Sequence, residues 1–129
     1  MKIDAKKLKK IFSSEPTVKL AYFFGSRAKG EEGPLSDYDF AVYLEEKDAV
    51  KIFNTRVMLM AKLSKHFKTD AVDLVVLNNS ESPELNYDVI EEGILLYEKS
   101  PYKLLVEPKI LNEYFDFYSM LKKYNFTKA

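Results

Sequence analysis

The sequence has 129 residues, 47% of them hydrophobic, which is enough for one domain with a proper core. Basic and acidic residues balance at 20 each, so no overall field favours nucleic acid and we expect no direct binding to it. Cysteine is absent and histidine occurs once, which excludes disulfides, thiolate catalysis and metal sites rich in either residue. No apolar stretch is long enough to span a membrane, so we expect a soluble cytoplasmic protein with a single domain, 1–129.

The N-terminal part of the chain reads as a short helix followed by a strand. Residues 4–14 have an amphipathic helical pattern, and Asp4 is placed to cap it. Residues 17–24 are apolar at both odd and even positions, which is typical of a strand that is covered on both faces. We therefore expect this strand to lie in the centre of a sheet.

The strand leads directly into a Gly25-Ser26 pair and one predicted helical turn that Gly30 closes. A turn of this kind points backbone N–H groups at a ligand and favours negative charge. Glycine has no Cβ, so a phosphate can approach closely, and the Ser26 hydroxyl can donate a further hydrogen bond. The predicted nucleotide-binding residues are Gly25, Ser26, Arg27, Lys29 and Ser36, of which Arg27 and Lys29 are equally consistent with plain surface charge.

The next strand, residues 37–44, alternates in polarity. One face is predicted to carry Asp37, Asp39, Ala41 and Tyr43, and the other Tyr38, Phe40, Val42 and Leu44. The second set is a core face. The first set begins with two carboxylates one pleat apart.

A long helix over residues 47–67 is predicted to cross over to a parallel strand at 71–77. Its apolar residues at helical spacing are Val50, Phe53, Val57, Met60, Ala61 and Ser64. Asp73 is the only charged residue of the strand that follows. Asp73 could cap a turn or pair with a lysine, but a carboxylate in an apolar strand is also a natural third member for the Asp37–Asp39 pair.

The C-terminal part is predicted to contain a helix at 83–92 that Gly93 ends, a short edge strand at 94–97 and a last helix at about 108–124. The last helix carries one apolar stripe of Ile110, Leu111, Tyr114, Phe117, Tyr118 and Leu121. We interpret this stripe first as core packing and second as a surface for a partner.

Three carboxylates crowded together repel one another, so the arrangement makes sense only with cations. Oxygen ligands suit Mg²⁺, and a pair of ions can polarise a phosphoryl oxygen and activate an attacking oxygen. We therefore expect Asp37, Asp39 and Asp73 to be both metal ligands and catalytic residues, with two Mg²⁺ ions. The competing interpretation of Asp37 and Asp39 is a solvated strand edge.

Gly25-Ser26, ten residues, and then Asp37-Tyr38-Asp39 resembles the signature of the minimal nucleotidyltransferases of the polymerase-β-like superfamily. Asp73 matches the third acidic position of that family. The segments 92–98 and 114–117 resemble the antitoxin subgroup that is paired with HEPN-domain toxins. Lys29 departs from the pattern, because relatives often carry arginine there, and lysine lacks the bidentate fork.

The resemblance implies an α/β (α+β) fold with a small mixed sheet flanked by helices. It also implies an antitoxin that transfers AMP from ATP to a tyrosine of a cognate HEPN ribonuclease and forms a hetero-oligomer with it. Two alternatives stay open: a nucleotidyltransferase that acts on a small-molecule hydroxyl, and a non-catalytic antitoxin that acts by binding alone. The small size of the chain argues against a dedicated pocket for a small acceptor.

Overall fold

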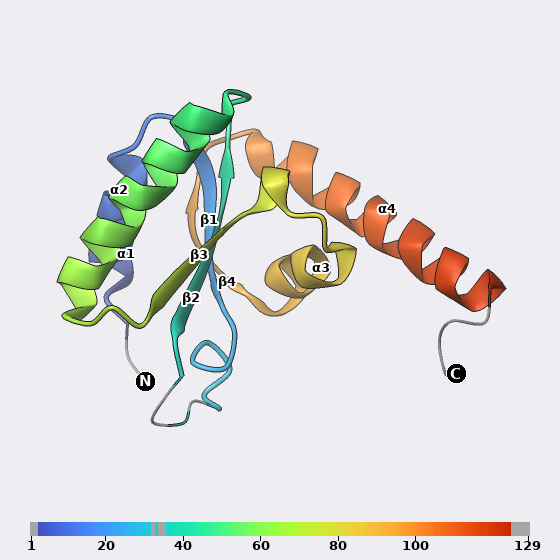
Figure 1. Ribbon diagram of the computed structural model, residues 1–129, viewed down its shortest axis with the longest axis horizontal. Helices are drawn as coiled ribbons and strands as arrows, with labels where there is room; N and C mark the ends of the chain where they lie inside the picture. Colours follow the sequence, from blue (N-terminus) through green and yellow to red (C-terminus); the bar gives the residue numbers. More distant parts are fainter. Residues whose placement is uncertain (1–2, 32, 34–35, 125–129) are drawn as a thin grey trace.

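The computed structural model describes residues 3–31, 33 and 36–124 as a sheet between two layers of helices. The four strands are β1 (Val18–Phe24), β2 (Tyr38–Leu44), β3 (Val72–Val76) and β4 (Ile94–Glu98). The helices are α1 (Ala5–Ser13), α2 (Ala49–Phe67), α3 (Pro83–Glu92) and α4 (Tyr102–Lys123), with a short 3₁₀ helix at Leu77–Asn79. Figure 1 shows α1 and α2 on one face of the sheet and α3 and α4 on the other. The predicted mixed sheet flanked by helices is confirmed.

The strand order is β3-β2-β1-β4, so β1 lies inside the sheet, as its apolar residues at both parities predict. β1 pairs antiparallel with β2 and with β4, whereas β2 and β3 are parallel. The parallel pair needs a crossover, and α2 supplies it. β3 and β4 are the two edge strands, which confirms the edge position expected for β4.

The predicted alternation of β2 is confirmed. Phe40 and Val42 are buried with Phe12 and Phe23 under α1 and α2. Ala41 belongs instead to the second core cluster, which contains Val89 of α3 and other residues from α3 and α4. Because successive side chains of a strand point to opposite faces, Asp39 lies on the side of α3 and α4.

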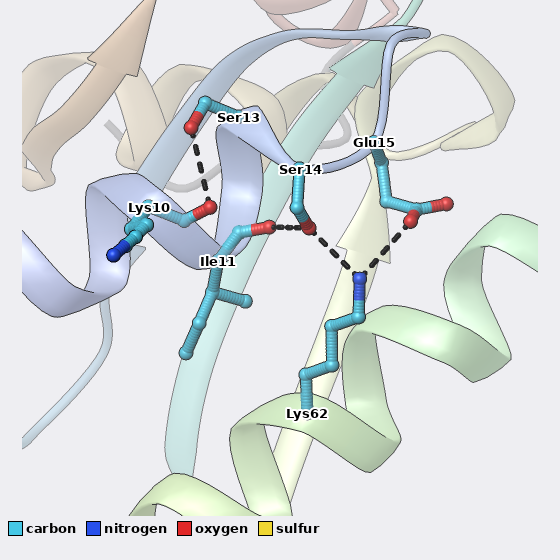
Figure 2. Close-up of polar contacts among 6 residues, drawn as sticks. All are labelled: Lys10, Ile11, Ser13, Ser14, Glu15 and Lys62. Carbon is cyan, nitrogen blue, oxygen red and sulfur yellow. Dashed lines mark hydrogen bonds and ion pairs between the residues drawn. The ribbon is translucent and has the colours of Figure 1, made fainter.

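Helix α1 begins as its sequence predicts, with the Asp4 carboxylate accepting a hydrogen bond from the Lys7 N–H at 3.2 Å. Its C-terminal end is tied to α2 by Lys62, whose Nζ donates to Ser14 Oγ at 2.8 Å and lies 3.1 Å from Glu15 Oε2 (Figure 2). These contacts fix the two helices that back the sheet.

Helix α2 is confirmed, but of the apolar stripe predicted from its sequence Met60 packs against the core, whereas the other large apolar residues are exposed. Val50, Phe53 and Val57 are 67%, 60% and 45% exposed, whereas the buried residues are Ile52, Leu59 and Leu63. Two stripes on this helix have helical spacing, and the stripe that faces the core also contains a charged residue. Hydrophobic spacing alone favoured the wrong face for that reason.

Helix α4 begins at Tyr102, earlier than the predicted start near residue 108, and contains Pro108 in its interior. Proline favours the first turn of a helix, which is why the sequence suggested a later start. Inside a helix the ring removes the hydrogen bond to the carbonyl four residues earlier. That carbonyl belongs to Leu104, which is 78% exposed, so water can take the place of the missing donor.

The C-terminal stripe of α4 is mixed rather than simply core. Ile110 is buried, and Tyr114 stacks on Tyr87 of α3 with ring centroids 3.9 Å apart, but Tyr118 is 42% exposed. Figure 1 shows the last turns of α4 extending away from the sheet. Among the residues that the structure describes, no helix is both long and apolar enough to cross a bilayer.

Candidate active site

The turn after β1 is built around Gly25, which has a φ of 83°. This left-handed conformation is open to glycine and unfavourable for other residues. Gly25 also directly follows Phe24, which is paired with Asp39 on β2. A Cβ at position 25 would overlap the Asp39 carboxylate. Glycine is therefore required here by the packing of Asp39 as well as by the backbone.

Residues 26–30 make the single predicted helical turn. The Lys29 N–H donates to the carbonyls of Gly25 and Ser26, both at 3.2 Å, and the Glu31 N–H donates to the Ser26 carbonyl at 2.8 Å. Gly30 closes the turn with a φ of 73°. The turn does not continue into a regular helix, so local N–H groups rather than a long helix dipole would favour an anion here.

Arg27 and Ser36 brace the loop between β1 and β2. Arg27 Nε donates to the Ser36 carbonyl at 2.9 Å, and its guanidinium lies over the Tyr38 ring, 4.2 Å from the centroid. Ser36 Oγ accepts a hydrogen bond from the Gly33 N–H at 2.8 Å. Both residues thus hold the loop beside the start of β2, and their expected contact with nucleotide stays a prediction.

Lys29 forms an ion pair with Glu92 at the end of α3. The hydrogen bond and the negative charge of Glu92 raise the pKa of Lys29 above its ordinary value. The two residues line a small cleft of about 170 Å³ together with Phe24, Gly25, Leu85 and Asp88. This cleft lies between the glycine turn and α3, and a phosphate entering it would compete with Glu92 for Lys29.

The carboxylates gather on the side of the sheet that α3 and α4 partly cover. Asp39 of β2 is in register with Asp73 of the parallel strand β3, and Asp37 precedes Asp39 by one pleat. Burial raises the pKa of Asp39, and the negative charges of Asp73 and Asp37 raise it further. The carboxylates of Asp37 and Asp73 are therefore close enough to Asp39 to act on it electrostatically.

As they stand, no three acidic or histidine side chains among the described residues converge closely enough to ligate one metal ion. Asp73 is 52% exposed, and its Oδ1 lies 3.5 Å from Nη2 of Arg56. The alternative prediction for Asp73 was an ion pair with a lysine. The structure shows an ion pair, but its partner is an arginine. An all-oxygen set with mutual repulsion fits a hard divalent cation such as Mg²⁺, which keeps several of its waters and is commonly shared with phosphate.

Arg56 is the residue of this region that the sequence analysis missed. It lies on α2 and reaches Asp73 around the free edge of β3. The signal in the sequence was its spacing with the buried residues Ile52, Leu59 and Leu63. A charged residue at such a position is uncommon unless it has a partner.

Comparisons with known proteins show to which family the chain belongs. A family model described as "Polymerase beta, Nucleotidyltransferase" matches residues 6–102. The protein adenylyltransferase MntA of Aphanizomenon flos-aquae is 35% identical over 96 residues, which cover 70% of this chain and 63% of that protein. The chain thus spans less than two thirds of the length of this relative.

Two solved structures share most of the fold. A chain of a toxin–antitoxin crystal structure with AMP-PNP is 27% identical with a TM-score of 0.76, and the match covers 94% of both chains. A chain of the structure of the tri-AMPylated Shewanella oneidensis HEPN toxin in complex with MNT antitoxin is 26% identical with a TM-score of 0.69, covering 92% of this chain and 90% of that one. The chain described here belongs to the polymerase-β-like nucleotidyltransferase family.

Proposed function

We propose that this chain is a protein adenylyltransferase that transfers AMP from ATP to a tyrosine of a cognate HEPN-domain ribonuclease and so neutralises it as an antitoxin. The observation that carries the proposal is the register of Asp39 with Asp73 on neighbouring strands, with Gly25 packed against Asp39. A glycine turn beside clustered carboxylates is an arrangement suited to a triphosphate and its counter-ions.

In this proposal each element of the site has one task. Backbone N–H groups at Gly25 and Ser26 bind the β- and γ-phosphates, and Lys29 exchanges Glu92 for a phosphate oxygen. Arg27 and Ser36 keep the loop against Tyr38, so that the turn stays beside β2.

The carboxylates carry the chemistry. Asp37, Asp39 and Asp73 would hold two Mg²⁺ ions, which would polarise the α-phosphoryl oxygens and offset the negative charge that develops on transfer. Asp73, whose side chain is 52% exposed, helps to take the proton from the tyrosine hydroxyl. The hydroxyl oxygen bonds to the α-phosphorus, and pyrophosphate leaves.

The nucleotide and the partner are proposed from the relatives. One similar structure holds AMP-PNP, and another holds a tri-AMPylated HEPN toxin with its MNT antitoxin. A site on a small domain leaves the acceptor to be supplied by a partner, which agrees with a protein tyrosine as the acceptor. We propose a hetero-oligomer with the HEPN protein on the same basis.

The test is transfer to the product of the neighbouring gene. The protein is incubated with labelled ATP, Mg²⁺ and that product, and label should move to the product. Asp39→Asn should abolish labelling without unfolding the protein, because the amide keeps the shape of the side chain and removes its charge. Neutralisation without any label would instead favour an antitoxin that acts by binding, and label on small hydroxyl compounds without a protein partner would favour the small-molecule alternative.

A further inference from the structure

Arg56 is a charged residue on the side of α2 that faces the sheet. It falls at helical spacing between Ile52 and Leu59, both of which are buried. Partial burial of a charged side chain removes water from its charge and costs free energy, so the charge needs hydrogen-bonding partners in the protein. Arg56 has two such partners, on β3.

Two contacts fix the guanidinium at the edge of the sheet. Arg56 Nε donates a hydrogen bond to the Leu74 carbonyl at 2.8 Å, a good length for such a bond. Nη2 lies 3.5 Å from Oδ1 of Asp73, the residue just before Leu74. Since β3 is an edge strand, the side chain can pass from the α2 side of the sheet toward the side of the carboxylates.

The contact with Asp73 is not a strong stabilising pair. Its separation exceeds that of a charge-assisted hydrogen bond, which is about 2.7–2.9 Å. Half of the Asp73 side chain is exposed, and ion pairs of this kind contribute little to folding. The firm anchor is the Leu74 carbonyl, and it holds a fixed positive charge next to a carboxylate that the proposed reaction needs.

We propose that Arg56 is a positioning residue that sets the orientation of Asp73 for divalent-ion binding. This inference rests on the proposed function, since it gives Asp73 a task only in that reaction. Groups that contact a metal-binding carboxylate without touching the metal fix its orientation. Their loss commonly lowers metal affinity or activity by about 10- to 100-fold. Arginine suits the task because one planar fork can reach a carbonyl and a carboxylate together.

The experiment measures Mn²⁺ binding by electron paramagnetic resonance in the presence of α,β-methylene-ATP, in which a carbon bridge replaces the oxygen that must leave the α-phosphorus. The rate of AMP transfer is measured separately with ATP, Mg²⁺ and the partner. Arg56→Met keeps most of the side-chain stem and removes the charge, and should weaken Mn²⁺ binding by about 10- to 100-fold. Its kcat for transfer should fall while the KM for ATP stays close to that of the wild type, because the glycine turn is untouched.

Lys62→Met is the matched control. Lys62 lies on the same helix and has the same side-chain exposure, 35%, but it pairs with Glu15, just after α1, instead of with Asp73 (Figure 2). This variant should bind Mn²⁺ as the wild type does. Arg56→Lys keeps the charge without the fork, should restore part of the affinity, and serves in place of Arg56→Met if that variant does not fold.

The outcomes separate the two proposals. Mn²⁺ binding in Arg56→Met that equals or exceeds that of the wild type contradicts the positioning role. Equal binding would mean that Arg56 only donates a hydrogen bond to the backbone of β3, and tighter binding would mean that its charge repels the ion. A wild type that binds no Mn²⁺ with the nucleotide contradicts the proposed function itself. Weaker binding in Arg56→Met, partial recovery in Arg56→Lys and no change in Lys62→Met together support the inference.

Discussion

The two faces of strand β2 differ in what holds them. On the side of α1 and α2, Phe40 is fully buried and packs against Phe23, with ring centroids 5.1 Å apart. On the other side, Asp39 meets a glycine turn and two further carboxylates. The aromatic face is stabilised by burial, whereas the other face is buried at Ala41 but carries repelling charges where the strand begins. The comparison indicates that the aromatic face provides the rigidity with which the charged face is held in place.

The largest expected effect on stability comes from the aromatic face. Phe40→Ala should lower the free energy of unfolding by about 3–5 kcal/mol, because it removes a fully buried ring and leaves a cavity. Urea denaturation measures this loss. Asp39→Asn should leave stability unchanged or raise it, although it should abolish transfer. A stability loss in Asp39→Asn as large as that in Phe40→Ala would contradict the proposed division between the faces.

A pair of variants on α2 tests which side of that helix supports the aromatic face. Leu59→Ala should cost about 2–5 kcal/mol of stability, since Leu59 is fully buried. Phe53→Ala should change stability by about 0.5 kcal/mol or less, because Phe53 is 60% exposed. Thermal or chemical unfolding of both variants checks the difference. Equal losses would mean that Phe53 also faces the core.

Gly25→Ala tests the junction between the two faces. A left-handed backbone costs a non-glycine residue about 1–2 kcal/mol, and the new Cβ must also displace the Asp39 carboxylate. Stability should fall and transfer should be lost. In an Asp39→Ala background the same change should cost less, because part of the overlap has gone. A double-mutant cycle of unfolding free energies with no coupling would argue against contact between the two positions.

The smallest expected effect is a dependence on pH. Burial and the charges of Asp73 and Asp37 raise the pKa of Asp39 in the folded protein above its value in the unfolded chain. The folded state then binds more protons between these two pKa values, so Asp39 lowers stability as pH rises through that window. Asparagine does not titrate. Urea unfolding is measured near the ordinary aspartate pKa of about 3.9 and again at about pH 7. The free energy of unfolding of Asp39→Asn, relative to that of the wild type, should be larger at the higher pH.

A difference in stability between Asp39→Asn and the wild type that stays constant between the two pH values would contradict a raised pKa at Asp39. Saturating Mg²⁺ provides a further check. If the carboxylates bind the ion, adding it should reduce the advantage of Asp39→Asn at the higher pH, because the ion relieves repulsion in the wild type.

Local alternation was enough to predict the strand positions of Asp39 and Asp73 in the candidate site. The parity of residues 37–44 separated Asp39 from Phe40, and the isolated charge in an apolar strand marked Asp73. The partnership of these two carboxylates also needed the parallel register of β2 and β3, which the crossover by α2 made predictable.

Features that depend on tertiary contact were not predictable in the same way. Helix α2 has two stripes with helical spacing, and only the packed structure shows that the stripe containing Arg56 faces the sheet. The start of α4 was hidden because Pro108 is tolerated inside a helix at an exposed turn. The contact of Arg56 with Asp73 requires β3 to be an edge strand. The order of strands in a sheet cannot be predicted from the sequence of one segment alone.

The most direct test of the account is the intact mass of the partner protein after incubation with ATP and Mg²⁺. With the wild-type chain the mass should rise by whole AMP units, and with Asp73→Asn or Asp39→Asn it should stay unchanged while both variants remain folded. An unchanged partner mass under conditions in which the wild-type chain still neutralises the partner would contradict nucleotidyl transfer as the function of these carboxylates.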